Sequence, residues 1–340
     1  MYGGSLLSAL LELQDVTKVF GGGFLDTRGV TVAVDRVTLT IEEDIPRIIT
    51  IAGESGSGKT TLARLLLGSI EPTSGTMLYR GKDLSGLSRR ERREFRREVQ
   101  PIFQDPFESY NPFYKVDHVL HSPIANFKLV SSRDERDRLV EEALLMVGLQ
   151  PDETLGRFPH QLSGGQRQRI MVARALMLKP RVILADEPVS MVDASLRATI
   201  LESIQDMKRE LGISVLYITH DLTTAFQISD EILIMYRGNV VEYGDVTKVI
   251  PNPQHAYTRM LIDSIPQANP GKRWGKLLEA TGTEMVGTGE ETEQFGIRPQ
   301  ATRHYDEVEP DHFVMISEND AGSPGEEELV SAATDQGPSS

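Results

Sequence analysis

The stretch "RIITIAGESGSGKTTLARLLLGSI", residues 47–70, decides the fold. It begins with an apolar run typical of a buried strand, continues through a glycine-rich loop, and ends with leucines at helical spacing. The loop at 53–61 matches the pattern G-x-x-x-x-G-K-[ST], which binds phosphate only when a strand precedes it and a helix follows it. Both conditions are met, so the stretch predicts a phosphate-binding loop in an α/β protein with a parallel sheet.

Each residue type in this loop has a chemical role in holding phosphate. Gly53, Gly56 and Gly58 let the backbone close around an anion, so that amides and the start of the next helix point at it. We expect Lys59 to reach the β- and γ-phosphates of a nucleotide and Thr60 to bind Mg²⁺. The other predicted contacts in the loop are Ser55, Ser57 and Thr61. A glycine turn without a ligand is disfavoured, because strand, loop and helix are all in place.

Two later apolar strands end in polar residues that suit phosphate chemistry. "VILADEP", residues 182–188, ends in Asp186 and Glu187, and "SVLYITHD", residues 214–221, ends in His220. Ligands of open α/β sheets bind at the carboxyl ends of the strands, so we expect these side chains beside the loop. Asp186 is predicted to hold Mg²⁺, Glu187 to orient or deprotonate the attacking water, and His220 to contact the γ-phosphate. The alternatives are a solvated Asp-Glu turn and a structural histidine.

A second glycine pair starts a helix more than a hundred residues later, in "QLSGGQRQR", residues 161–169. Ser163, Gly164 and Gly165 precede that helix and offer another anion site at a helix N-terminus. One nucleotide needs only one such cradle. We therefore predict that this loop serves the ATP of another molecule, with two chains packed head to tail around two shared sites.

Composition excludes several classes of chemistry. The 340 residues have room for about two domains. The chain has no cysteine, which excludes disulfides, thiol nucleophiles and cysteine-bound metals. Residues 276–340 hold 15 Asp and Glu against 3 Lys and Arg, so most of the net charge of −14 lies there. The rest is nearly neutral, and nucleic acid, which needs a basic face, is not an expected partner.

The apolar segments suggest neither secretion nor membrane insertion. The first residues, "MYGGSLLSALLEL", carry no basic leader and no small-residue cleavage site. No apolar run approaches the roughly 18 residues that a spanning helix needs. These features favour a protein of the cytosol; if it works at a membrane, another molecule must hold it there.

The order of motifs resembles the ATP-binding subunits of ABC transporters. "GESGSGKT", "LSGGQ", "ADEP" and "THD" occur in the family's order and spacing, and the resemblance covers residues 11 to about 265. It implies an α/β P-loop NTPase of the RecA-like kind, an ABC nucleotide-binding domain with an antiparallel β subdomain, an α-helical subdomain and a C-terminal extension. It also implies a homodimer or heterodimer of ATP-binding subunits that hydrolyse ATP with Mg²⁺.

Further residue roles follow from the resemblance alone. Gln104 in "FQDP" matches the glutamine that touches Mg²⁺ and couples to the membrane subunit. Phe20 matches the aromatic that stacks on adenine, with Val19 and Phe24 close enough to shift the register. Asp193 in "SMVD" matches the aspartate at the dimer interface. Gln166 completes the signature loop.

A narrower resemblance concerns the ATPases of oligopeptide, dipeptide and nickel permeases. It rests on "FQDPFESYNPF", "FPHQLSGGQRQR", "MYRGNVVEYGD" and "NPQHAYTRMLIDSIP". It implies a bacterial or archaeal importer with two transmembrane permease subunits and an external solute-binding protein. "EDIPRIITIAGES" departs from the usual Gly-Glu before the phosphate strand, and the extension lacks the cysteines of many relatives.

These observations predict an ATPase that drives uptake of peptides or similar solutes, oligosaccharides included, from the cytoplasmic face of the membrane. The alternatives are a soluble ABC protein of translation or DNA repair, an exporter motor, and a stand-alone P-loop kinase or GTPase. The expected organisation is a nucleotide-binding domain at 11–250, with its helical subdomain at about 106–162. A C-terminal extension at 251–316 and an acidic, disordered tail at 317–340 follow.

Overall fold

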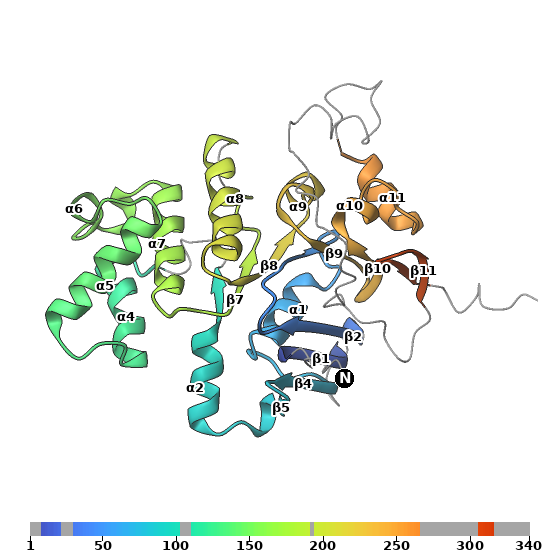
Figure 1. The fold of residues 1–340 in the computed structure, drawn as a ribbon, viewed down its shortest axis with the longest axis horizontal. Helices are drawn as coiled ribbons and strands as arrows, with labels where there is room; N and C mark the ends of the chain where they lie inside the picture. Colours follow the sequence, from blue (N-terminus) through green and yellow to red (C-terminus); the bar gives the residue numbers. More distant parts are fainter. Residues whose placement is uncertain (1–7, 22–29, 103–109, 191–193, 266–304, 316–340) are drawn as a thin grey trace, which may run out of the picture.

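In the computed structural model, residues 8–21, 30–102, 110–190, 194–265 and 305–315 are described. Two sheets organise this part of the chain, with helices packed around them (Figure 1). The larger sheet carries the phosphate loop. The helix that follows this loop packs against both sheets.

The larger sheet has the strand order β11-β12-β10-β9-β3-β8-β7-β6. It contains the predicted parallel strands, and its strands β10 to β12 pair antiparallel. The parallel strands are β3 (Ile48–Ala52), β6 (Val99–Ile102), β7 (Val182–Asp186), β8 (Ser214–Thr219) and β9 (Glu231–Tyr236). All residues of β3 and β8 are buried, which explains why they read as continuous apolar runs.

The smaller sheet is antiparallel, in the order β2-β1-β4-β5. Its strands are β1 (Ala9–Phe20), β2 (Thr31–Glu42), β4 (Ser74–Tyr79) and β5 (Lys82–Asp83). The alternation of apolar and polar residues over 11–50 predicts antiparallel strands, and β1 and β2 confirm this. The range extends too far, because its last residues already belong to β3, the predicted strand before the loop, which is buried on both faces in the parallel sheet.

Helix α1 (Lys59–Leu66) joins the two sheets into one core. Its apolar face, Leu62, Leu65 and Leu66, lies in a cluster with strands of both sheets. The remaining helices near the sheets are α2 (Arg89–Glu98), α8 (Ala194–Arg209), α9 (Leu222–Ile228), α10 (Val246–Val249) and α11 (Ala256–Asp263), with a 3₁₀ turn at Leu84–Gly86. The packing of α1 fixes the loop that precedes it between the sheets.

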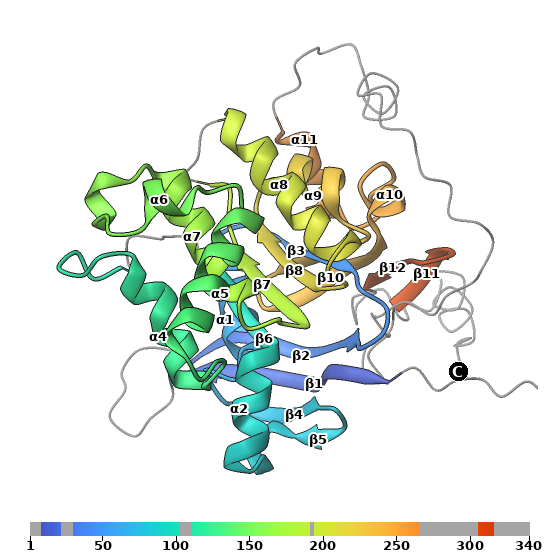
Figure 2. The ribbon, with the colours of Figure 1, turned by 60° about the vertical axis from the view of Figure 1, so that its left-hand side comes forward.

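The segment between β6 and β7 forms a helical group with a core of its own. It contains α4 (Asp117–Phe127), α5 (Arg133–Met146), α6 (Pro151–Thr154), a 3₁₀ turn at Pro159–Gln161 and α7 (Gly164–Leu176). Leu120, Leu144 and Ile170, from three of these helices, are fully buried together. Figure 2 shows the group beside the sheets, with α7 leading back to β7.

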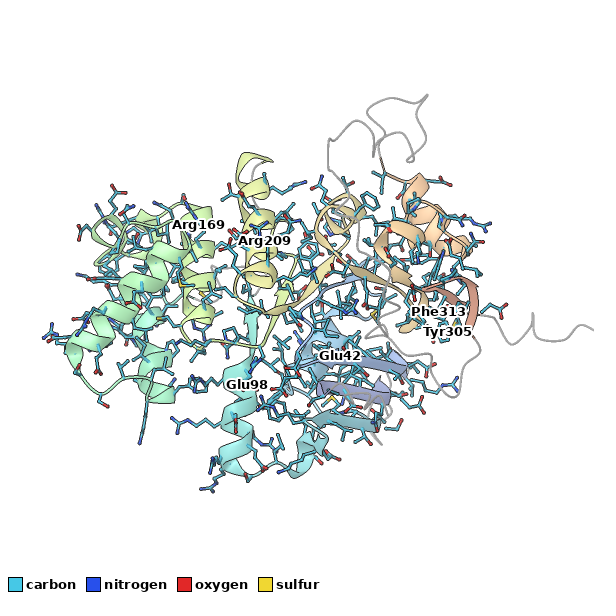
Figure 3. All side chains as sticks on the ribbon, in the orientation of Figure 1. Glu42, Glu98, Arg169, Arg209, Tyr305 and Phe313 are labelled. Atoms are coloured by element: carbon cyan, nitrogen blue, oxygen red, sulfur yellow. The ribbon has the colours of Figure 1, made fainter. Side chains whose placement is uncertain are left out.

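Residues 305–315 extend the larger sheet. Strands β11 (Tyr305–Glu309) and β12 (His312–Met315) form a hairpin on β10 (Asn239–Asp245). Figure 3 labels Tyr305 and Phe313 beside that edge, and the ring of Phe313 stacks on Tyr243 with centroids 4.9 Å apart. The sequence did not indicate that this hairpin joins the sheet.

Candidate nucleotide site

Three parallel strands end at one edge of the larger sheet and bring the predicted phosphate-binding residues together. Strand β8 lies between β3 and β7, with Ala52 opposite Thr219 and Asp186 opposite Ile218. The residues that follow these strands are Gly53, His220 and Glu187. The phosphate loop and the ends of "VILAD" and "SVLYIT" therefore meet, as predicted.

Two glycines of the loop are required by close approach of other backbone segments. Gly53 has a φ of 148°, and a Cβ there would lie 2.3 Å from the Met235 carbonyl oxygen. Gly58, with a φ of 110°, would place a Cβ 2.2 Å from the Ala33 carbonyl oxygen. Neither position accepts a side chain, so the glycines let the loop lie against β9 and β2.

Lys59 is held inside its own loop. Its Nζ donates hydrogen bonds to the carbonyl oxygens of Gly53 at 2.6 Å and Glu54 at 2.7 Å. Burial lowers the pKa of Lys59, while the nearby carboxylates of Glu187 and Asp186 act to raise it. The buried ammonium is therefore placed between the glycine loop and the acids of β7. Ser57 is buried, Thr61 is half-buried, and Ser55 and Thr60 are exposed.

The two acids of "VILADEP" lie in different environments. Burial raises the pKa of Asp186, and the neighbouring Glu187 carboxylate raises it further. Glu187 has a φ of 44°, and its Oε1 lies 3.0 Å from His220 Nδ1. The His220 side chain is 61% exposed, whereas that of Glu187 is only 18% exposed. Glu187 and His220 thus form a pair at the sheet edge, with the imidazole facing outward.

The second glycine pair lies at the start of α7, in the helical group. Ser163 Oγ accepts a hydrogen bond from the Gln166 N–H, and Gln166 Oε1 accepts one from the Ser163 N–H. This reciprocal cap presets the N-terminus of the helix. Ser163 is exposed, Gly164 and Gln166 are half-buried, and Gly165 is buried. The structure places this loop on a different hydrophobic cluster from α1.

Of three residues whose roles follow from the resemblance alone, Phe20, Gln104 and Asp193, the structure describes only Phe20. Phe20 ends β1, is 43% exposed, and has Lys18 Nζ 5.4 Å from its ring centroid. Gln104 and Asp193 lie outside the described residues.

One contact of the phosphate loop was not predicted. The hydroxyl of Tyr257, on α11, accepts a hydrogen bond from the Glu54 N–H at 2.9 Å. The two residues are 203 positions apart, and no local pattern around "HAYT" indicates the contact.

Two family models match the chain. Residues 34–190 match the model described as ABC transporter, and residues 241–289 match the model described as oligopeptide/dipeptide transporter, C-terminal region. The oligopeptide transport ATP-binding protein OppF of Salmonella typhimurium is 41% identical over 254 residues, 74% of this chain and 75% of that protein. The oligopeptide transport ATP-binding protein AppF of Bacillus subtilis is 40% identical over 261 residues, 76% and 78% of the two chains.

Solved structures with the same fold include nucleotide-bound cassettes. The dimeric post-hydrolysis structure of the ATP-binding cassette MJ0796, bound to ADP and Pi, is 28% identical with a TM-score of 0.61. The match covers 69% of this chain and 98% of that one. The cbiO1 protein of Clostridium perfringens is 24% identical with a TM-score of 0.61, covering 80% and 99%, and shares the fold. Among the described residues, the longest and most apolar helices fall short of what a bilayer span requires.

Proposed function

Because the chain belongs to the ABC transporter family of ATP-binding subunits, which hydrolyse ATP with Mg²⁺ and dimerise as cassettes, we propose that it powers peptide uptake through an importer. The similarity to OppF and AppF, both named as oligopeptide transport proteins, supports a peptide as the cargo. The match of residues 241–289 to the oligopeptide/dipeptide transporter C-terminal region supports an importer over a soluble ABC protein or an exporter. Its partners are two permease subunits, which hold it at the cytoplasmic face of the membrane, and an external solute-binding protein.

The observation that carries the proposal is the meeting of Lys59, Asp186, Glu187 and His220 around a glycine loop. In the proposed mechanism the loop at 53–61 binds the phosphates, and Lys59 turns from its own carbonyls toward the β- and γ-phosphates. Glu187 orients or deprotonates the attacking water, and His220, hydrogen-bonded to Glu187, reaches the γ-phosphate.

The donor set fits Mg²⁺. Thr60 offers an exposed hydroxyl at the start of α1, and Asp186 offers a carboxylate that burial makes hard to ionise alone. A hard divalent cation prefers such oxygen ligands and would stabilise the Asp186 anion. We assign Thr60 and Asp186, with Gln104, as its ligands. When bound there, the ion would supply positive charge that offsets the negative charge of the phosphates.

The loop of Ser163, Gly164, Gly165 and Gln166 is proposed to close on the γ-phosphate held by the second cassette. Its support is that the loop caps a helix in the helical group, away from the core of α1. We assign Asp193 to the same dimer interface and Phe20 to stacking on the adenine. Closing of the dimer is passed to the permease through the segment of Gln104.

The proposed organisation of the chain follows the same lines. The nucleotide-binding domain spans residues 11–250, with a helical subdomain at about 106–162. The C-terminal extension spans 251–316, and an acidic tail spans 317–340.

Sharing of the site is tested by mixing a Lys59→Ala chain with a Ser163→Ala chain. Each mutant dimer alone has two broken sites, whereas a mixed dimer has one intact site, so ATP turnover per mixed dimer returns to about half of the wild-type value. Ser132→Ala is the matched control, because Ser132 caps α5 in the same way as Ser163 caps α7. No recovery in a confirmed mixed dimer would contradict sharing.

The cargo is tested with the chain reconstituted in liposomes beside its permease subunits and binding protein. We expect a mixture of tri- to pentapeptides to stimulate ATP turnover and a trisaccharide to leave it at the basal rate. Stimulation by the trisaccharide alone would overturn the peptide assignment and leave the ATPase intact.

A further inference from the structure

The C-terminal region contacts the phosphate loop directly. Tyr257, the second residue of α11, is 5% exposed, and its hydroxyl accepts a hydrogen bond from the Glu54 N–H at 2.9 Å. Residue 257 lies within the stretch that matches the oligopeptide/dipeptide transporter C-terminal region and outside the stretch that matches the ABC transporter model. An element outside the matched cassette thus supplies a partner to the second residue of the loop.

This hydrogen bond holds one peptide unit of the loop from one side while Lys59 holds it from the other. The peptide between Gly53 and Glu54 donates its N–H to Tyr257 and accepts Lys59 Nζ at its carbonyl oxygen, at 2.6 Å. Because Gly53 has no side chain and a φ of 148°, sterics alone do not fix the orientation of this peptide. The two hydrogen bonds fix it instead.

The start of α11, which carries Tyr257, is held by a buried network. Both carboxylate oxygens of Glu242, on β10, accept hydrogen bonds at the start of α11, from the Gln254 N–H at 2.8 Å and the His255 N–H at 3.0 Å. His312, on β12, contacts the same carboxylate through Nε2 at 2.6 Å. His255 Nδ1 then accepts the Tyr257 N–H at 3.2 Å, capping the helix.

The ring of Tyr257 is fixed as well. It lies against the ring of Tyr236, on β9, with centroids 4.3 Å apart. Strand β9 pairs directly with β3, the strand that leads into the loop. The helix cap and the buried carboxylate hold the backbone of Tyr257, and the aromatic neighbour holds its ring, so the hydroxyl has the limited freedom that a positioning group needs.

We propose that Tyr257 is a positioning residue of the ATP site: its hydroxyl fixes the Gly53–Glu54 peptide and so sets the position from which Lys59 turns toward the phosphates. The C-terminal region is thereby part of the machinery that binds nucleotide. The proposal rests on the assignment of residues 53–61 as the phosphate loop.

The test is Tyr257→Phe in the full chain, which keeps the ring and removes only the acceptor of the Glu54 N–H. We expect Mg-ADP and Mg-ATP to bind about five- to tenfold more weakly in calorimetric titration, because a half-buried donor is left unpaired. The number of sites per chain stays unchanged. In the transport complex the KM for ATP rises by a similar factor, and kcat stays within about twofold.

Tyr243→Phe is the matched control. Tyr243 is 2% exposed, and in the described part of the chain its hydroxyl has no hydrogen-bond partner. Removal of this hydroxyl is expected to leave nucleotide affinity at the wild-type value. The control therefore separates the loss of a buried hydroxyl in general from the loss of the one on the loop.

Three outcomes are distinguishable. Tyr257→Phe could lower the number of nucleotide sites per chain, or lower kcat at constant KM, and leave the nucleotide affinity unchanged. In that case Tyr257 is only structural and the proposal is wrong. The same holds if affinity equals that of Tyr243→Phe. If Lys59→Ala binds nucleotide as tightly as the wild type, the phosphate loop itself is misassigned, and the proposed function fails with it.

Discussion

Replacement of Glu187 by glutamine removes a charge with little change in shape. The backbone of Glu187 is anchored by its N–H, which donates to the Ile218 carbonyl oxygen at 2.9 Å, and its φ of 44° is equally strained for both side chains. An amide can also keep a hydrogen bond to His220 Nδ1, now 3.0 Å from Oε1. The variant should therefore fold as the wild type does, with a free energy of unfolding within about 1 kcal/mol.

The expected effect on catalysis is large, because the amide cannot accept a proton from water. General base catalysis contributes roughly 10²- to 10⁴-fold, and hydrolysis should fall by about that factor. Binding of ATP should be as tight as before or tighter, since a carboxylate close to Lys59 and to the phosphates has been neutralised. Slow hydrolysis with tight binding should make ATP-bound dimers accumulate.

The assay combines phosphate release with gel filtration in the presence of Mg-ATP. Glu202→Gln, on an exposed position of α8, is the matched control for loss of one carboxylate and should behave as the wild type. Hydrolysis within twofold of the wild type in Glu187→Gln would refute the assignment of Glu187 as the base. Slow hydrolysis combined with lost ATP binding would show that Glu187 supports the loop instead.

Three further predictions concern the loop and the C-terminal hairpin. Lys59→Ala should weaken Mg-ATP binding by at least about tenfold in calorimetric titration, because the phosphates lose a buried cation; unchanged affinity would contradict its role. Gly58→Ala should lower the free energy of unfolding in urea by about 2 to 4 kcal/mol, since its Cβ meets the Ala33 carbonyl oxygen at 2.2 Å. Gly81→Ala, with a φ of 73° and open space, should cost only about 1 to 2 kcal/mol, and equal losses would refute the steric argument. Burial alone would lower the pKa of His312, but hydrogen bonds to two carboxylates raise this pKa overall. The contribution of His312 to the free energy of unfolding is therefore complete below about pH 6.5 and is lost as the pH rises through the raised pKa. Urea titrations between pH 6 and pH 9 should show this decline in the wild type and not in His312→Gln; parallel curves would exclude the effect.

Local sequence was sufficient to predict the strand, loop and helix at 47–70, because each part of that unit depends on its immediate neighbours. The buried apolar runs of strands β7 and β8 were predicted for the same reason, since burial on both faces requires a continuous apolar run. The helix after Ser163 was predicted from the glycine pair at its start. The structure adds that Ser163 caps this helix by accepting a hydrogen bond from the Gln166 N–H.

Other features were missed because their signals are weak or far apart. The hairpin of β11 and β12 consists of strands of only five and four residues, and the first of them is largely acidic, so its alternation is hard to distinguish from a loop. The contact of Tyr257 with Glu54 spans 203 positions and leaves no periodic trace. The buried pair of Glu242 and His312 likewise consists of two residues that are usually exposed.

The sequence by itself determined the chemistry of this protein: a glycine loop with a lysine, two acids and a histidine at strand ends, and a second glycine pair before a helix. Spacing along the chain suffices for these, because loops, caps and buried strands form through local backbone geometry. Only the tertiary structure decided that β8 lies between β3 and β7, that Glu187 faces His220, and that α11 reaches the loop. Those relations are set by packing between distant segments, where many sequences satisfy the same local rules.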